Sequence, residues 1–289
     1  MPPANNLRSL EKNLALRARY RKERFMMALV GLGTGLAFLI LLLVLAYALA
    51  QGAGALNLDF FLKDMRPPGE TGGGLRQAIV GTLIVDGLGL LIALPFGLAA
   101  GILLAEYPDH PVNPYLRLLS DTLNGMPAIL FGLLAFILIV KPMGGFSGLS
   151  GAFALGFLMI PILARSTEGV LSLVPKEIRE AGLALGLPRW RVILSLVLPT
   201  ARAGLITGVL LAFARAAGEA APLLFTAFGS PLLELNPLKP MDTLPLRLFA
   251  FAISPYEDWH RQAWAAGLVL FGLITLTSLL ARWASRRRF

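Results

Sequence analysis

The sequence predicts an all-α, polytopic membrane protein, and three observations lead to that prediction. Hydrophobic residues make up 56% of the 289 residues and charged residues only 15%, and the mean hydropathy is +0.70. A soluble domain carries roughly 25% charged residues, and one core of this size cannot bury several uninterrupted apolar runs. The composition therefore excludes a soluble enzyme, a disordered chain and a fibrous protein. Because the runs are continuous and do not alternate, they also exclude an outer-membrane barrel.

Six apolar segments predict six transmembrane helices, since each is close to or longer than the ~20 residues needed to cross a bilayer. They cover residues 26–50, 75–105, 122–140, 148–171, 201–228 and 262–283. The second is long enough to tilt, bend at Pro95 or extend beyond the lipid. The transmembrane domain is thus expected at 26–283, between a basic N-terminal segment (1–25) and a basic tail (284–289).

Charge sets the expected direction of these spans. Most of the 26 Lys and Arg residues precede the first span, lie between the fourth and fifth, or follow the sixth. Basic loops stay on the cytoplasmic side, so both termini are expected in the cytoplasm of a bacterial or archaeal inner membrane. Residues 48–50 resemble a signal cleavage site, but the apolar stretch before them exceeds the usual 7–15 residues. We therefore expect the first helix to be retained.

Several kinds of site chemistry are missing from the sequence. It contains no Cys and only two His, and no Lys follows a Gly, so thiolate chemistry and the P-loop pattern for ATP are both absent. We expect no catalytic residue, no metal and no cofactor in this chain. An intramembrane enzyme would need reactive groups converging at one depth, and only Asp86 and Glu219 qualify. A scaffold that transports nothing would not explain an Arg in the middle of a span.

The loop 172–200 carries the strongest local signal, because it predicts two short helices. Ile178, Gly182 and Leu185 share one face of the first helix. Gly186 is suited to end that helix and Pro188 to start the next, which Pro199 is expected to end just before the fifth span. A rigid, amphipathic loop of this kind could dock into a groove on a cytoplasmic partner, although an ordinary interfacial loop is the simpler interpretation.

Within this loop, the residues Glu180, Ala181, Gly182, Gly186, Leu198 and Pro199 follow a known pattern. They resemble the EAA loop of ABC importer permeases, E-A-A-x3-G-x9-I-x-L-P, with Gly182 in place of the second Ala and Leu196 in place of the Ile. Both replacements keep a small or aliphatic side chain. The resemblance implies the MetI-like fold, with a coupling loop that contacts a partner ATPase.

Further segments resemble the phosphate permeases of the PstA type. They are residues 95–97, 105–107, 126–132, 159–168, 204–208 and 214–227. The resemblance implies a heterodimer with a sister permease (PstC-like), two copies of an ATP-binding subunit (PstB-like) that binds ATP and magnesium, and an external phosphate-binding protein (PstS-like). Ala128 and Ala220 stand where relatives often carry Ser and Thr, which puts a direct role of these two positions in doubt.

Charges within the spans suggest a substrate path. A mid-membrane Arg costs about 2.5–3.5 kcal/mol on insertion scales, so Arg215 is expected to face a partner or a water-lined path. Glu219, four residues later, is expected to pair with it, and these positions match the motif assigned to the path in the family. A guanidinium can hold phosphate by paired hydrogen bonds. The alternative is a structural Arg–Glu pair that joins helices.

Three other charged residues have less certain roles. Asp86 lies at a depth similar to that of Glu219, so it is expected either beside that pair or facing the sister subunit. Arg76, at the outer end of the second span, could collect anions or form a solvated helix end. Arg165 could line an exit or extend its head group to the interface.

These features predict a permease subunit of an ATP-driven phosphate importer that forms half of the translocation path. The nearest alternatives are a permease for sulfate or molybdate and the sister phosphate subunit.

Overall fold

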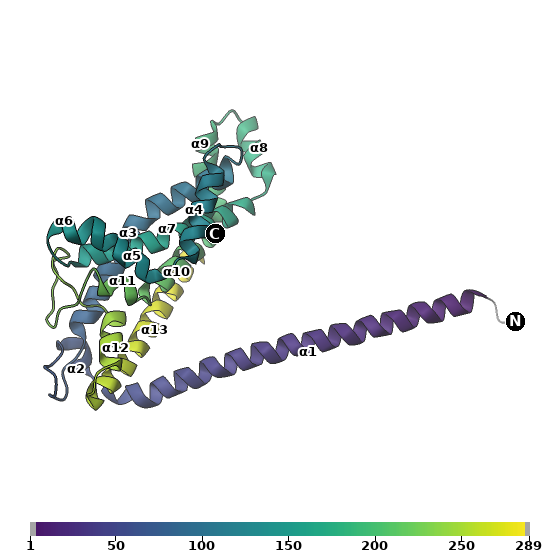
Figure 1. Cartoon of the computed structure of the whole chain (residues 1–289). Coiled ribbons are helices and arrows are strands. Elements are labelled where there is room, and N and C mark those ends of the chain that lie inside the picture. The colour runs from purple at the N-terminus through teal and green to yellow at the C-terminus, as the bar shows by residue number, and fades with distance from the viewer. Residues whose placement is uncertain (1–3, 287–289) are drawn as a thin grey trace. The chain divides into compact units, whose positions relative to one another are not determined.

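The computed structural model describes residues 4–286 (Figure 1), and side chains are described for residues 19, 20 and 22–283. The chain divides into two compact units, residues 1–50 and 51–289. The first unit is formed by most of one long helix, α1 (Ala4–Gly52). This helix is basic at its start and continuously apolar from Phe25 onward, as a single membrane span requires.

The second unit is helical almost throughout the part that the structure describes. In chain order its helices are α2 (Leu58–Leu62), α3 (Arg76–Glu106), α4 (Asn113–Gly125), α5 (Ala128–Ala135), α6 (Lys141–Met143), α7 (Gly148–Ser172), α8 (Lys176–Ala184), α9 (Arg189–Val192), α10 (Leu198–Ala217), α11 (Ala221–Leu224), α12 (Leu244–Ala252) and α13 (Glu257–Arg286). α8 and α9 lie at one end of this unit, and α2 and α12 lie at the other (Figure 1). We call these the α8/α9 end and the α2/α12 end.

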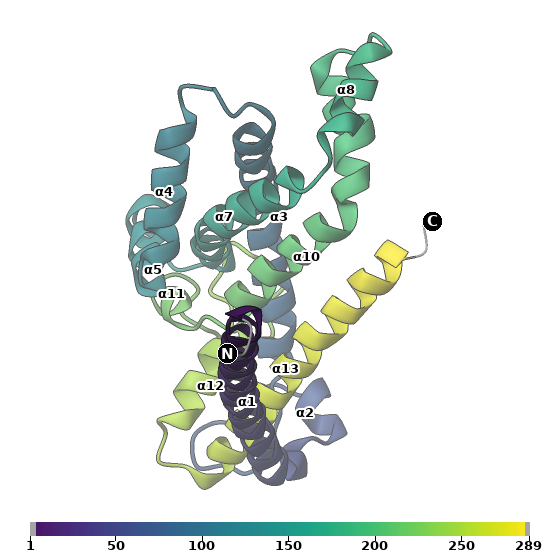
Figure 2. The same cartoon turned by 90° about the vertical axis from the view of Figure 1, so that its right-hand side faces the viewer.

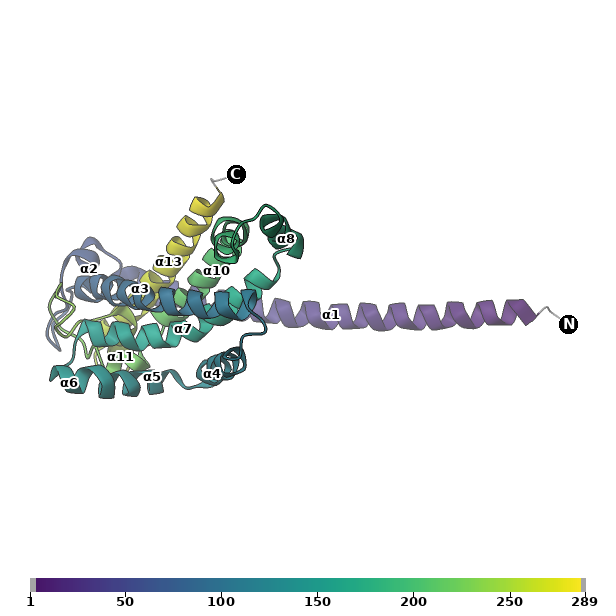
Figure 3. The ribbon, with the colours of Figure 1, turned by 90° about the horizontal axis from the view of Figure 1, so that it is seen from above.

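α3 and α7 form the centre of the unit, with α4 and α5 on one side and α10 and α13 on the other (Figures 2 and 3). Small residues let the two helices approach closely. A Cβ atom on Gly101 of α3 would lie 2.4 Å from the Cβ of Thr167, and one on Gly97 would lie 2.5 Å from the Cβ of Leu163. Packing of this kind favours small residues in membranes, because van der Waals contact replaces the hydrophobic effect there.

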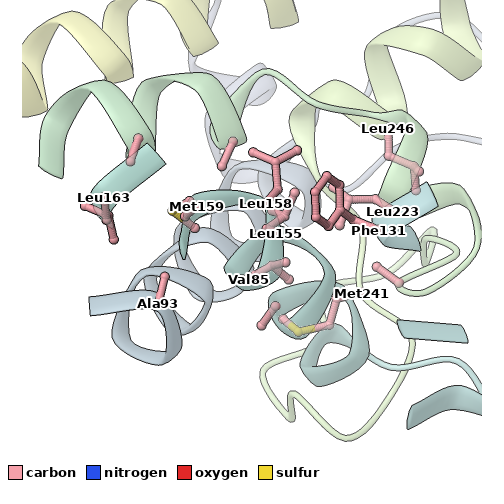
Figure 4. Packing of buried hydrophobic residues seen from close by; sticks show 14 residues of the cluster. Val85, Ala93, Phe131, Leu155, Leu158, Met159, Leu163, Leu223, Met241 and Leu246 are labelled. Atoms are coloured by element: carbon pink, nitrogen blue, oxygen red, sulfur yellow. The ribbon is translucent and has the colours of Figure 1, made fainter. Parts of the chain in front are cut away.

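The main core fills the space between α3, α7, α10 and α11 (Figure 4). Val85, Leu155, Met159 and Leu223 are almost fully buried in it. A second cluster, around Phe60, joins α2 to α12 and α13 at the α2/α12 end.

Five helices of the described chain are long and apolar enough to cross a membrane, or six if one bent pair counts as a span. Four of the predicted spans coincide with α1, α3, α7 and α13 to within a few residues, apart from the extensions of α1 and α13 at their ends. The predicted basic tail, 284–289, extends beyond the described residues. The predicted third and fifth spans differ from the structure.

The predicted third span, 122–140, crosses a sharp bend. α4 ends at Gly125, and the next helical segment, residues 128–143, turns from it by 106°. Pro127 explains the break, since proline lacks a backbone N–H and pushes the residue before it out of the helical region. Met126 is accordingly extended, with φ −74° and ψ 140°. The predicted third span is therefore divided between two helical segments, of which the second begins at Ala128.

The predicted fifth span, 201–228, is displaced toward the N-terminus. The helix is continuous from Arg189 to Ala217, because a π-helical turn at Ile193–Val197 joins α9 to α10. Pro199 thus lies at the start of α10 and does not end a helix as predicted. The wide turn before it relieves the clash between its ring and the carbonyl of residue i−4. Beyond Gly218, only the short α11 is helical before residue 228.

Candidate functional site: a two-helix loop and the charges of the spans

The predicted coupling loop folds as a hairpin of α8 and α9 at one end of the unit (Figure 2). A Cβ atom on Gly182 would lie 2.8 Å from Leu196 Cδ1 and 2.9 Å from Val192 Cγ2, so the two helices approach closely here and a larger side chain would require these neighbours to shift. Gly186 ends the first helical segment with φ +76°, a conformation that glycine adopts without strain. Glu180, in contrast, is exposed. The hairpin thus has a close-packed interior and a free acidic face.

The other predicted coupling residues occupy two different settings. Ala181 is exposed beside Glu180, on the outward face of α8. Leu198 and Pro199 lie in the first turn of α10, the first partly buried and the second exposed. The six residues of the EAA pattern therefore belong to one continuous segment, with the last two in the membrane-crossing helix itself.

A buried ion pair fixes this hairpin to the end of α3. The Glu106 carboxylate is only 3% exposed. It accepts hydrogen bonds from Nε of Arg179 at 3.0 Å and from Nη2 at 2.5 Å. The same guanidinium donates to the carbonyl oxygens of Leu171 at 2.9 Å and Val174 at 2.7 Å. The hydrogen bond with Glu106 raises the pKa of Arg179 although burial opposes it, so the charge persists at every physiological pH.

α9 is attached to the same point. Nη2 of Arg189 donates to the backbone oxygen of Glu106, and its guanidinium lies 4.5 Å from the centre of the Tyr107 ring. Both helices of the hairpin are therefore bonded to Glu106, the last residue of α3, and α9 also contacts Tyr107, which follows it. Charge-assisted and bidentate contacts of this type are the stronger hydrogen bonds in proteins.

A second charge network joins α4 to α7. Glu168 accepts from Nε of Arg117 at 2.9 Å and from Nη1 of Arg165 at 2.6 Å, and Arg165 also pairs with Asp121 at 2.9 Å. A pocket of about 480 Å³ lies beside the network and includes Arg117, Arg165 and Glu168 in its lining. Arg165, predicted to line an exit or to reach the interface, thus lies in a four-residue cluster that holds the bent α4 in place.

Arg215 lies on a face of α10 that no other described part of the chain covers. Ala212 and Ala216 are buried, and Val209 and Phe213 line an apolar groove with α3 and α13. Arg215 falls on neither face and is exposed, as are Leu211 and Thr207 on the turns before it.

Glu219 is not one turn along the same helix, as the sequence suggested, because α10 ends at Ala217 and Gly218 caps it. Neither the Arg215 nor the Glu219 side chain forms a hydrogen bond or ion pair with any residue that the structure describes. The predicted i to i+4 pair is therefore absent here, and the Arg215 charge is left open for another group.

Asp86 is buried in α3, with 1% exposure, and neither carboxylate oxygen has a hydrogen-bond partner. Among the described residues, Asp86 therefore forms no hydrogen bond or ion pair with the Arg215 or Glu219 side chain, and its side chain is covered within this chain. Its expected place beside that pair, or facing a sister subunit, stays a prediction.

Arg76 begins α3 and is engaged with Asp64. Its Nε and Nη2 donate to the two carboxylate oxygens at 3.0 and 3.1 Å, and the backbone N–H of Leu233 adds a third bond at 3.2 Å. Partial burial alone would raise the pKa of Asp64, but these bonds outweigh it and lower the pKa. Arg76 is therefore a structural clasp at the α2/α12 end, which disfavours the predicted role in collecting anions.

No cluster of three or more His, Asp or Glu side chains that could hold a metal ion occurs in the described part of the chain. Sequence reasoning did not single out Glu106, Arg179 or Glu168, although each is a charge at the end of an apolar run or within the loop. These residues could have been found by searching for opposite charges at the ends of neighbouring spans, since such charges tend to pair.

Comparison with known proteins agrees with this architecture. The model of the family described as binding-protein-dependent transport system inner membrane component matches residues 97–289. Among solved structures, a bacterial alginate ABC transporter with its periplasmic protein aligns with a TM-score of 0.59 at 16% identity, covering 92% of this chain and 96% of that one. An inward-facing MetNI methionine ABC transporter aligns with a TM-score of 0.57 at 17% identity, covering 74% and 95%. At this identity the likeness shows the fold.

Closer relatives are named for phosphate. The chain is 44% identical over 233 residues to the phosphate transport system permease protein PstA of Xylella fastidiosa, covering 80% of this chain and 81% of that protein. It is 40% identical to that of Pasteurella multocida over 80% and 82%, and 38% identical to a probable PstA of Methanocaldococcus jannaschii over 73% and 76%. The chain therefore belongs to the family of binding-protein-dependent transport system inner membrane components.

Proposed function

We propose that the chain is a permease subunit of an ATP-driven importer of inorganic phosphate. The observation that carries this proposal is the open guanidinium of Arg215, which lies on an uncovered face of α10 in a chain 44% identical to a PstA phosphate permease. Arg215 lies in the last turn of α10, close to the end of the candidate span Arg189–Ala217, and not at the middle of a span as the sequence suggested. An anion that passes along this face would bind to its exposed charge.

Phosphate is suited to this guanidinium. It is a mono- or dianion at neutral pH, and two of its oxygens can accept parallel hydrogen bonds from one Arg. Glu219 lies just beyond the helix end, where it can accept a hydrogen bond from a protonated phosphate oxygen that sulfate lacks. Transit also requires weak binding, so one Arg whose side chain has no ion-pair partner among the described residues is appropriate for a conducting site.

The uncovered face implies a partner. Thr207, Leu211 and Arg215 are exposed along one side of α10, so the single chain supplies one wall of a path. We propose that a sister permease supplies the other wall, that two copies of an ATP-binding subunit hydrolyse ATP with magnesium, and that an external phosphate-binding protein delivers the anion. This chain contributes no catalytic step.

The α8/α9 hairpin is the proposed contact for the ATPase. Glu180 and Ala181 are exposed on α8, while Arg179, the residue before them, is anchored inward. The α8/α9 end would then be cytoplasmic, as would both termini, in agreement with the excess of basic residues on that side.

Uptake of radiolabelled phosphate at low external phosphate tests the proposal. A strain lacking this chain is restored with wild type, Arg215→Ala, Arg215→Lys or, as the control, Arg261→Ala, which removes an exposed Arg near the start of α13. We expect Arg215→Ala to reduce uptake by about tenfold or more, as loss of a charged hydrogen bond does, and Arg215→Lys to retain part of it. The folding of this chain should not depend on Arg215, whose side chain has no partner among the described residues, and uptake is compared per assembled complex because a sister permease is proposed to face it.

Two outcomes would contradict the proposal. If deletion leaves phosphate uptake unchanged in a strain with no second importer, the substrate assignment is wrong, and sulfate and molybdate are tested next. If Arg215→Ala transports as well as Arg261→Ala, the path does not pass Arg215.

A further inference from the structure

Helix α3 is bonded at both of its ends. At the α8/α9 end, Glu106 binds Arg179 of α8, and Arg189 of α9 binds the backbone of Glu106. At the α2/α12 end, Arg76 binds Asp64. These attachments are made by the first and last residues of the helix.

The α2/α12 end of α3 is tied to α12 as well. The backbone N–H of Leu244, at the start of α12, donates to Thr82 Oγ1 at 2.8 Å. Gln77 donates to Asp242 at 3.3 Å. A helix of 31 residues, at about 1.5 Å per residue, extends over roughly 46 Å. α3 therefore connects two distant ends of the unit through direct polar bonds.

The hairpin itself is built to move as one body. Gly182 brings α8 into contact with Val192 and Leu196, so the two helices cannot easily slide past each other. Its polar connections to α3, in contrast, converge on Glu106 and Tyr107. A displacement of the hairpin would consequently act on the last turn of α3 as well as on α10, with which α9 is continuous.

We propose that Glu106 and Arg179 form the joint that passes movement of the α8/α9 hairpin to α3, and through α3 to the α2/α12 end. They are positioning residues that act on the path through the helix and do not touch the transported anion. The inference rests on the proposed function, because it assumes that an ATPase moves the hairpin.

Burial argues that the joint has a purpose other than stability. An ion pair with a carboxylate only 3% exposed gains little over well-packed apolar side chains, because both charges lose their hydration. A bidentate Arg–carboxylate pair, however, fixes direction as well as distance. A contact that passes movement from the hairpin to α3 requires a fixed direction as well as a fixed distance.

The test uses the complete transporter in lipid vesicles and measures both ATP hydrolysis and phosphate accumulation. Glu106→Gln and Arg179→Lys each keep a polar side chain but remove the bidentate ion pair. The matched control is Asp109→Asn, which removes an exposed carboxylate three residues beyond Glu106. Breaking a buried pair lowers stability, so both rates are measured per assembled complex. On that basis we expect basal ATP hydrolysis to be unchanged and phosphate transported per ATP to fall about tenfold in the first two variants, within the usual range of coupling between sites.

A cross-link gives a second, independent reading, because the native chain contains no Cys. In Glu106→Cys with Arg179→Cys, the ratio of phosphate to ATP should be low, and a short bifunctional thiol reagent that joins the two sulfurs should restore it. A joint that acts as one body tolerates the link. If the reagent leaves the ratio low or blocks ATP hydrolysis, the two residues do not transmit movement as a unit.

The outcomes separate this inference from the proposed function. If the wild-type complex hydrolyses ATP but accumulates no phosphate, the substrate assignment fails, and the joint is then measured with whichever oxyanion is accumulated. If the wild type couples ATP hydrolysis to phosphate and Glu106→Gln keeps the wild-type ratio, the joint is refuted while the proposed function stands. A parallel fall in assembly and in both rates, with the ratio unchanged, would assign the pair a structural role and also refute the joint.

Discussion

The Glu106–Arg179 pair at the α8/α9 end and the charges near the end of α10 differ in whether the chain supplies a partner for them. Glu106 and Arg179 satisfy each other almost completely, with additional bonds to two backbone carbonyls. The Arg215 and Glu219 side chains have no hydrogen bond or ion pair with any described residue. Both sets adjoin or lie within apolar spans, where an unpaired charge is costly.

This difference suggests how to assign roles to charges in a membrane chain. Where the chain supplies the partner, the pair fixes one element against another, as Glu168 does for α4 and α7. Where it supplies none and the side chain is exposed, the partner is expected from another subunit or from the transported ion. Asp86 fits neither group, since it is buried and without a partner. Substitutions at three positions test this distinction between paired and unpaired charges.

The largest effect is expected from Arg247→Met in the paired group. Arg247 donates to the fully buried Asp242 at 2.7 Å, and its removal leaves a carboxylate without its counter-charge. Breaking a buried pair in this way typically costs about 3–5 kcal/mol. The melting temperature of the purified complex should therefore fall by roughly 10 °C, since each kcal/mol shifts the melting of a domain of this size by about 2–4 °C.

The control for that measurement is Arg66→Met, because Arg66 forms an exposed pair with Glu70 at 3.8 Å. Pairs of this kind contribute little to stability, so its melting temperature should match the wild type. Equal effects of the two substitutions would mean that burial does not distinguish the paired charges, and the comparison would lose its physical basis.

An effect of intermediate size and opposite direction, a rise in the melting temperature, is expected from Asp86→Leu. A buried polar group without a hydrogen bond costs about 1–3 kcal/mol, and Leu has a similar volume without that cost. If Asp86 has no role in this conformation, the complex should melt several degrees higher and transport phosphate normally. Thermal melting and phosphate uptake on the same preparations decide the matter. A more stable complex that no longer transports would show that Asp86 finds a partner in another conformation.

Most of the fold was predictable from the sequence, because continuous apolar runs of sufficient length dictate helices in a membrane. The boundaries of α3 and α7 follow from where those runs begin and end. The predicted spans were wrong where hydrophobicity alone does not show that a helix bends or ends. The bend at Pro127 and the end of α10 at Gly218 both occur inside apolar stretches, where local backbone chemistry outweighs composition.

The candidate site was predictable only in part. The EAA spacing located the hairpin, and Arg215 stood out as a charge within a span. The partner of each charge depends on packing between distant segments, such as the 73 residues that separate Glu106 from Arg179. The sequence therefore suggested a local Arg215–Glu219 pair, and the early end of α10 removed it.

The smallest effect on the melting temperature is expected from Asp64→Asn at the α2/α12 end, and it should depend on pH. Because the pKa of Asp64 is lowered in the folded chain, the carboxylate form stabilises the fold above the ordinary Asp value of 3.8, and this contribution is lost as the pH falls through the lowered value. The melting temperature of wild type should exceed that of Asp64→Asn by a small, constant amount between pH 7 and about pH 5, and the difference should disappear in stronger acid. Asp59→Asn, in an exposed pair with Lys63, serves as the control and should show no such trend. A difference that grows as the pH falls would reverse the sign of the linkage and contradict the clasp between Arg76 and Asp64.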